Sequence, residues 1–165
     1  MKLPGVLMVF CLAVLLFSPA QAQAAQEIKP FVSGSYRQIV AARLGKPFVV
    51  NLWSLTCSYC KVELSMFKEL AGKYPMLELV LISTDTPEEE KLVAATLAKF
   101  SLGKAEAWVF ADSYTERLRF EIDRQWQGEL PRTYFFSAKG EVNAISGELE
   151  QKEVEQWVKE QYAPG

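Results

Sequence analysis

The sequence predicts one α/β domain in which helices cover both faces of a central mixed sheet. Two near-continuous apolar segments, 48–53 and 76–83, are typical of buried strands, and residues with helical spacing lie between them. Another helix and strand follow, and then a hairpin pattern. Alternating strands and helices build a largely parallel sheet with right-handed crossovers, to which the hairpin adds an antiparallel edge.

The first half of the domain has clear start and stop signals. A helix predicted over 36–44 ends at Gly45-Lys46-Pro47, which leads into the strand at 48–53. The next helix is expected from Ser58 to Gly72, with apolar residues recurring every three or four positions. Asp85-Thr86-Pro87 then indicates another helix, which continues towards Gly103.

The second half continues the pattern. We expect a strand at 105–111, a helix at 114–122, hairpin strands at 133–137 and 141–145 with a turn at Lys139-Gly140, and a closing helix at 151–162. The polar stretch 25–30 is interpreted as a linker that precedes the domain.

The N-terminus is typical of a signal peptide. Lys2 supplies a positive charge, residues 6–17 form an apolar run, and Ala20-Gln21-Ala22 or Ala22-Gln23-Ala24 offers a small-residue cleavage site. The run is shorter than the roughly 20 residues of a membrane-spanning helix. We therefore predict a cleaved signal over 1–25, a domain over 26–165 and a periplasmic location, with an uncleaved membrane anchor as the alternative. Cys11 lies within the apolar run and has no expected role.

Composition excludes several classes of function. Half of the 165 residues are hydrophobic, which is enough for one packed domain, and the net charge is only −2. Without a basic cluster, nucleic acid is not an expected partner. The chain contains no histidine, so Ser-His catalysis and metal sites that use histidine are excluded.

Cys57 and Cys60 are the two cysteines that remain once the signal is removed, in a Cys57-Ser58-Tyr59-Cys60 pattern. They lie where an apolar strand gives way to an amphipathic helix, so the helix dipole favours a thiolate at Cys57. Cys60, one turn later, can attack the sulfur of Cys57 and resolve a mixed disulfide. A structural staple is disfavoured, because a two-residue loop gains little chain entropy from closure. Half of a zinc site is the other alternative, but a second cysteine pair or histidines to complete it are lacking.

Gly45-Lys46-Pro47, the strand at 48–53, the cysteine pair and Glu63 resemble the TlpA/ResA-like thioredoxin family over about residues 30–165. The resemblance implies a thioredoxin-like fold in which Cys57 attacks a substrate disulfide and Cys60 resolves it. Glu63, three residues after the second cysteine, would then act as a proton acceptor that tunes thiol ionisation. The alternative for Glu63 is an ordinary solvated carboxylate on a helix. No cofactor or metal is expected beyond the redox-active disulfide.

Glu129-Leu130-Pro131-Arg132-Thr133 is similar to the segment that carries the cis-proline of this family. The resemblance implies a cis bond before Pro131 and a Leu130 backbone that binds an extended substrate peptide. The alternative is a proline that simply starts a strand.

Other residues near the pair bear on substrate and proton transfer. Asn51 occupies the position of the buried aspartate of cytoplasmic thioredoxins, so Glu63 becomes the expected substitute. Trp53 is expected in the core or in contact with substrate. Tyr59 is assigned to the substrate-facing surface, and Thr56 departs from the tryptophan that usually precedes the first cysteine of this family.

These features together predict an exported thiol–disulfide oxidoreductase that reduces disulfides of periplasmic proteins, acts as a monomer and is re-reduced by a membrane electron donor. The absence of histidine between the cysteines favours a reducing pair. Tyr59 also resembles the residue at that position in periplasmic disulfide isomerases, so an isomerase or oxidase is the enzymatic alternative. A copper(I) carrier that uses the two thiolates is the non-enzymatic one.

Overall fold

The computed structural model describes residues 26–162, which form a six-stranded mixed sheet with helices on both faces, as predicted. The strand order is β1-β4-β3-β2-β5-β6. Neighbouring strands among the first four are parallel, whereas β5 is antiparallel to both β2 and β6. The strands are β1 (Ile28–Phe31), β2 (Phe48–Trp53), β3 (Leu79–Ser83), β4 (Glu106–Phe110), β5 (Arg132–Phe136) and β6 (Val142–Ser146).

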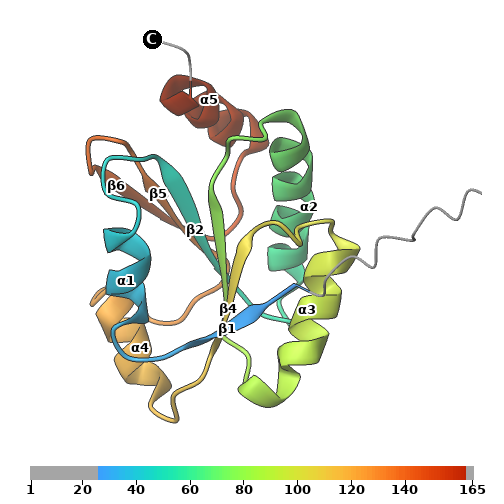
Figure 1. Cartoon of the computed structure of the whole chain (residues 1–165), viewed down its shortest axis with the longest axis vertical. Coiled ribbons are helices and arrows are strands. Elements are labelled where there is room, and N and C mark those ends of the chain that lie inside the picture. The colour runs from blue at the N-terminus through green and yellow to red at the C-terminus, as the bar shows by residue number, and fades with distance from the viewer. Residues whose placement is uncertain (1–25, 163–165) are drawn as a thin grey trace, which may run out of the picture.

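Helices cover the sheet in two groups (Figure 1). They are α1 (Ser35–Ala41), α2 (Ser58–Lys73), α3 (Glu90–Lys99), α4 (Thr115–Ile122) and α5 (Gln151–Tyr162), and a short 3-10 turn (Pro87–Glu89) precedes α3. Apolar residues of α2, α3 and α5 pack in one core cluster, and those of α1 and α4 pack in a second cluster on the opposite face. Strand residues alternate between the two clusters, as the two-residue period of a strand requires.

The central strands β2 and β3 are buried because helices cover both faces of the sheet. Every residue of these two strands is buried, which accounts for their almost unbroken apolar sequences. Within the described range, no helix is long and apolar enough to cross a membrane. The predicted signal peptide and Cys11 lie outside the described residues.

The predicted linker at 25–30 is wrong in part, because Ile28–Phe31 form edge strand β1, which pairs in parallel with β4. This strand has four residues, of which only Ile28 and Phe31 are buried, so its sequence shows no clear strand pattern. It also contains Pro30, which an edge strand tolerates. Several boundaries also differ from expectation by one to five residues, including the end of α1, which is Ala41 rather than residue 44. β3 begins at Leu79 rather than at residue 76, and α3 begins at Glu90, after the 3-10 turn.

Candidate active site

Cys57 and Cys60 form a disulfide at the start of helix α2, with Cα atoms 5.3 Å apart. Cys57 is the N-cap residue, and its Sγ accepts a hydrogen bond from the backbone N–H of Cys60 at 3.1 Å. No acidic residue occupies the first turn of α2. The positive end of the helix dipole acts on the Cys57 sulfur, which favours the thiolate when the disulfide is reduced.

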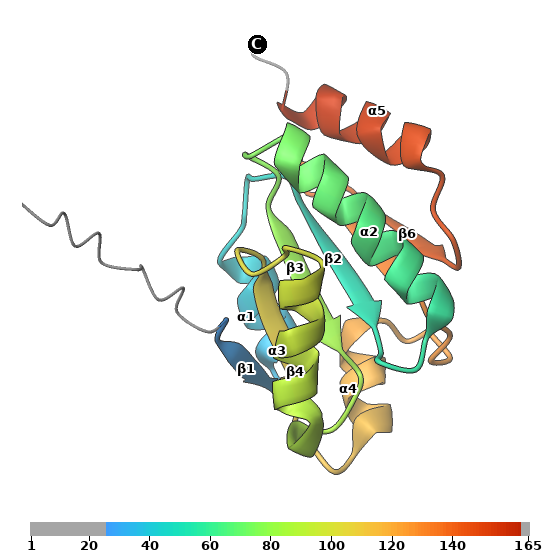
Figure 2. The same cartoon turned by 90° about the vertical axis from the view of Figure 1, so that its right-hand side faces the viewer.

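The two sulfurs differ in access to solvent. The Cys60 side chain is completely buried in the core cluster, whereas Cys57 is partly exposed beside it. The end of β2 and the beginning of α2 meet at one end of the sheet (Figure 2), and a short loop joins them. Cys57 is thus the sulfur of the pair that a second protein can reach.

Glu63 is a buried carboxyl group on α2, only 1% exposed. Its Oε2 accepts hydrogen bonds from Asn51 Nδ2 at 2.8 Å and Thr133 Oγ1 at 3.4 Å, and its Oε1 accepts one from the Leu149 N–H at 3.1 Å. Burial raises the pKa of Glu63 to about 7, although these three hydrogen bonds act in the opposite direction. The alternative of a solvated helix carboxylate is therefore wrong.

Asn51 links Glu63 to strand β5. Its Nδ2 also donates to Thr133 Oγ1 at 2.9 Å, and antiparallel pairing places Asn51 directly opposite Thr133. Sequence reasoning missed Thr133 and the Leu149 backbone. The only sequence signal for Thr133 is its position two residues after Pro131. That position indicates a contact with Asn51 only when the pairing of β2 with β5 is known.

The Leu130–Pro131 peptide bond is cis, as the resemblance implied. Leu52 pairs with Arg132, so continuing the antiparallel register places Pro131 opposite Trp53, at the end of β2 that leads to the cysteines. The Pro131 carbonyl accepts a hydrogen bond from Gly147 N–H at 2.9 Å. The backbone N–H and carbonyl of Leu130 make no hydrogen bond to another described residue.

Trp53 and Tyr59 have opposite environments. Trp53 is completely buried, and its indole Nε1 has no hydrogen-bond partner within residues 26–162. Because a buried indole offers no surface to a substrate, direct substrate contact by Trp53 is contradicted and its role is core packing. Tyr59 is 63% exposed between the two cysteines, which fits a substrate-facing position.

Asp85 was predicted only as part of a helix start, but the structure places it beside the cysteine loop. Its Oδ2 accepts hydrogen bonds from the Leu55 N–H at 2.9 Å and from the Ser83 hydroxyl. The carboxylate thus ties the loop that precedes Cys57 to the end of β3.

We expect Asp85→Ala to lower the free energy of unfolding by about 1–3 kcal/mol, because the Leu55 N–H loses its partner. Urea denaturation of the oxidised protein measures this change. Asp85→Asn keeps an oxygen acceptor and should lose less. Equal losses in the two variants would contradict a role for the Leu55 hydrogen bond.

No group of three or more histidine, cysteine, aspartate or glutamate side chains is arranged to hold a metal ion in the described part of the chain. The described site contains two cysteines, one buried carboxyl group and a cis-proline loop. Together with the fold, this site defines a thioredoxin-like thiol–disulfide oxidoreductase. Residues 25–145 match the AhpC/TSA family, and the chain belongs to that family.

Solved structures with the same fold include several exported or redox proteins. A secreted Mycobacterium tuberculosis disulfide oxidoreductase homologous to E. coli DsbE aligns with a TM-score of 0.56 and 21% identity, over 73% of this chain and 85% of that one. A thiol:disulfide interchange protein of the thioredoxin family from Chlorobium tepidum gives 0.58 and 20%, over 73% and 83%. StoA from Bacillus subtilis gives 0.50 and 19%, over 69% and 83%. These similarities support the predicted fold.

Proposed function

We propose that this protein reduces disulfides of exported proteins in the periplasm through the Cys57–Cys60 pair. The observation that carries the proposal is the asymmetry of the pair, in which Cys57 caps α2 and is partly exposed while Cys60 is buried. An accessible thiolate can attack a disulfide of another protein, and a protected neighbour can attack only the sulfur beside it.

The reaction follows from these positions. The Cys57 thiolate attacks one sulfur of the target disulfide, forms a mixed disulfide and releases the other target sulfur as a thiolate. The Cys60 thiolate then attacks Cys57 Sγ, which restores the Cys57–Cys60 disulfide and releases the second target sulfur. Two electrons pass to the target, which takes up two protons. A dithiol or other membrane electron donor must then reduce the pair again.

Glu63 is proposed as the proton acceptor for the Cys60 thiol. It lies three residues after Cys60 on α2 and therefore projects from the same side of the helix. A carboxyl group with a pKa of about 7 can both accept and return a proton near neutral pH. Cys60 itself is completely buried, so water is not a ready acceptor for its proton.

The substrate is proposed to bind as an extended peptide beside the cis-proline loop. The free backbone groups of Leu130 can pair with such a peptide in the manner of an added strand. Tyr59 adds an exposed aromatic surface next to Cys57. We infer that the protein recognises mainly backbone and nearby apolar groups, rather than a single side chain.

Cys60→Ala is expected to trap substrates as mixed disulfides with Cys57, because the resolving thiol is missing. Non-reducing electrophoresis of periplasmic extracts, followed by mass spectrometry, identifies the trapped proteins. Cys57→Ser/Cys60→Ala is the matched control and should trap none. A Cys60→Ala variant that accumulates no mixed disulfide would contradict the proposed reaction.

The direction of the reaction is tested by equilibrium with glutathione. A reductase should have a reduction potential below that of the glutathione pool, and each 30 mV corresponds to about 1.4 kcal/mol for the two-electron couple. A potential well above the pool would favour an oxidase or isomerase. Tight stoichiometric copper(I) binding without insulin reduction would favour the metal carrier.

A further inference from the structure

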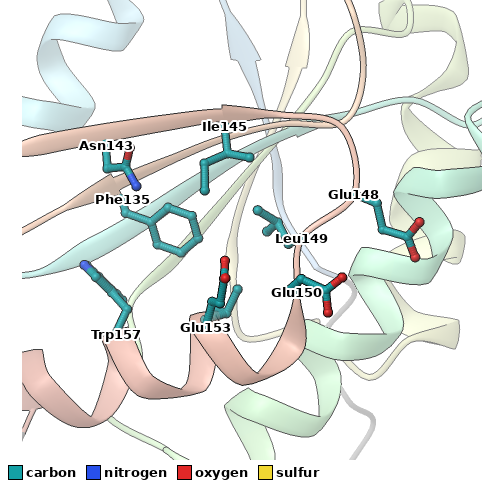
Figure 3. Close-up of a pocket in the computed structure, with 9 residues that line it drawn as sticks. Phe135, Asn143, Ile145, Glu148, Leu149, Glu150, Glu153 and Trp157 are labelled. Atoms are coloured by element: carbon teal, nitrogen blue, oxygen red, sulfur yellow. The ribbon is translucent and has the colours of Figure 1, made fainter.

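A cavity of about 150 Å³, lined by both apolar and polar residues, lies between the β5–β6 hairpin and helix α5. In Figure 3, Phe135 and Ile145 point from the sheet towards α5, and Trp157 rises from α5 towards the sheet. Cys57, Cys60 and Glu63 do not line the cavity, although Leu149, whose N–H donates to Glu63, does. A volume of about 150 Å³ is large enough for one aromatic ring.

The strand beside this cavity has an open edge. β6 is the last strand of the sheet and pairs only with β5 within residues 26–162. Hydrogen bonds from Gly147 N to Pro131 O and from Ser137 N to Glu141 O show that odd-numbered residues of β6 bond to β5. The backbone groups of Val142, Ala144 and Ser146 therefore point outward and can pair with another strand.

Three glutamates also line the cavity, namely Glu148, Glu150 and Glu153. All three are exposed, and none forms an ion pair with another residue of the described range. Figure 3 shows Glu148 and Glu150 at one end of the cavity and Glu153 in its middle. Apolar side chains that line a cavity, an open strand edge and three glutamates without ion-pair partners thus occur in one place.

We propose that this surface binds an extended segment of a partner protein that carries an aromatic side chain flanked by lysine or arginine. The segment adds to the outer edge of β6, its aromatic ring enters the cavity, and its basic side chains pair with the three glutamates. Side chains at alternate positions of a strand share one face, so the pattern basic-x-aromatic-x-basic matches the surface.

Charge complementarity favours this partner over a second copy of the chain. A symmetric β6–β6 dimer brings two sets of three glutamates to the same edge, where like charges repel.

The test uses the oxidised protein and a fluorescent, cysteine-free peptide, Ser-Lys-Thr-Phe-Thr-Lys-Ser, with binding measured by anisotropy. Ala144→Pro removes an outward N–H from an edge strand, and Ala144→Val keeps it. Glu148→Gln/Glu150→Gln/Glu153→Gln removes the charges, and Glu27→Gln/Glu90→Gln/Glu116→Gln is the control at exposed glutamates elsewhere. Because the peptide contains no cysteine, the result does not depend on the proposed reductase activity.

We expect Ala144→Pro and the cavity triple variant each to weaken peptide binding by about tenfold or more, while both controls stay within about twofold of the wild type. Replacing the phenylalanine of the peptide with serine, or its lysines with glutamates, should cause a similar loss. Binding that survives Ala144→Pro and the cavity triple variant would overturn the proposal, as would no binding at millimolar peptide. Self-association that Ala144→Pro abolishes would assign the edge to a second copy instead.

Discussion

Cys57→Ser is expected to abolish disulfide reduction, with activity falling by at least about a thousandfold to the background of the uncatalysed reaction. The hydroxyl of serine stays protonated at neutral pH and cannot replace a thiolate that caps a helix. The buried Cys60 cannot take over the attack, because its side chain has no exposed area. Turbidity from insulin reduction in the presence of a small dithiol measures the loss.

Ser58→Ala is the matched control for this variant. Ser58 is exposed in the first turn of the same helix, and its side chain makes no hydrogen bond to another described residue. We expect its rate to remain within a few-fold of the wild type. If Cys57→Ser kept more than a few per cent of the wild-type rate, Cys57 would not be the attacking group.

Glu63→Gln is expected to change how stability depends on pH. In the folded protein the pKa of Glu63 is raised from 4.5 to about 7, so the folded state binds more protons than the unfolded state between these values. The contribution of protonated Glu63 to the free energy of unfolding is fully present below about pH 4.5 and is lost as the pH rises through about 7. The loss amounts to about 3 kcal/mol, and Glu63→Gln should remove it.

Urea denaturation of the oxidised protein at several pH values between 5 and 8 measures this effect as a difference in slope. The side-chain amide of the Glu63→Gln variant, placed among the donors of Asn51, Thr133 and Leu149, lowers the free energy of unfolding by an amount that does not depend on pH. The slope of the free energy of unfolding against pH therefore reports only the titration of the carboxyl group. Glu69→Gln, at an exposed glutamate of the same helix, should keep the wild-type slope. Identical slopes for Glu63→Gln and wild type would show that Glu63 does not titrate in this range.

The same variant tests the proposed proton transfer. If Glu63 accepts the Cys60 proton, reduction rates should fall near neutral pH, and the part of the pH profile with a midpoint near 7 should disappear. A purely structural Glu63 would lower stability without changing the shape of the rate profile. The shape of the profile therefore distinguishes the two roles.

Features that depend on neighbouring residues in the chain could be predicted from sequence. β2 and β3 are buried on both faces, so their apolar runs revealed them directly. The cysteine pair could be placed at a helix start because the strand ends and the helical spacing begins within a few residues. The cis bond at Pro131 was predicted from a local motif that resembles a family, rather than from any physical preference of the chain.

Features that depend on contacts between distant segments needed the structure. Glu63 lies on the buried face of α2, and its hydrogen-bond donors come from β2, from β5 and from the Leu149 segment, which are distant from it in the sequence. Asp85 likewise meets Leu55 because parallel β2 and β3 end at the same edge. The sequence by itself determined the layers of the fold and the two sulfurs. The tertiary structure decided the environment of the Glu63 carboxyl group, because its hydrogen bonds come from segments up to 86 residues away.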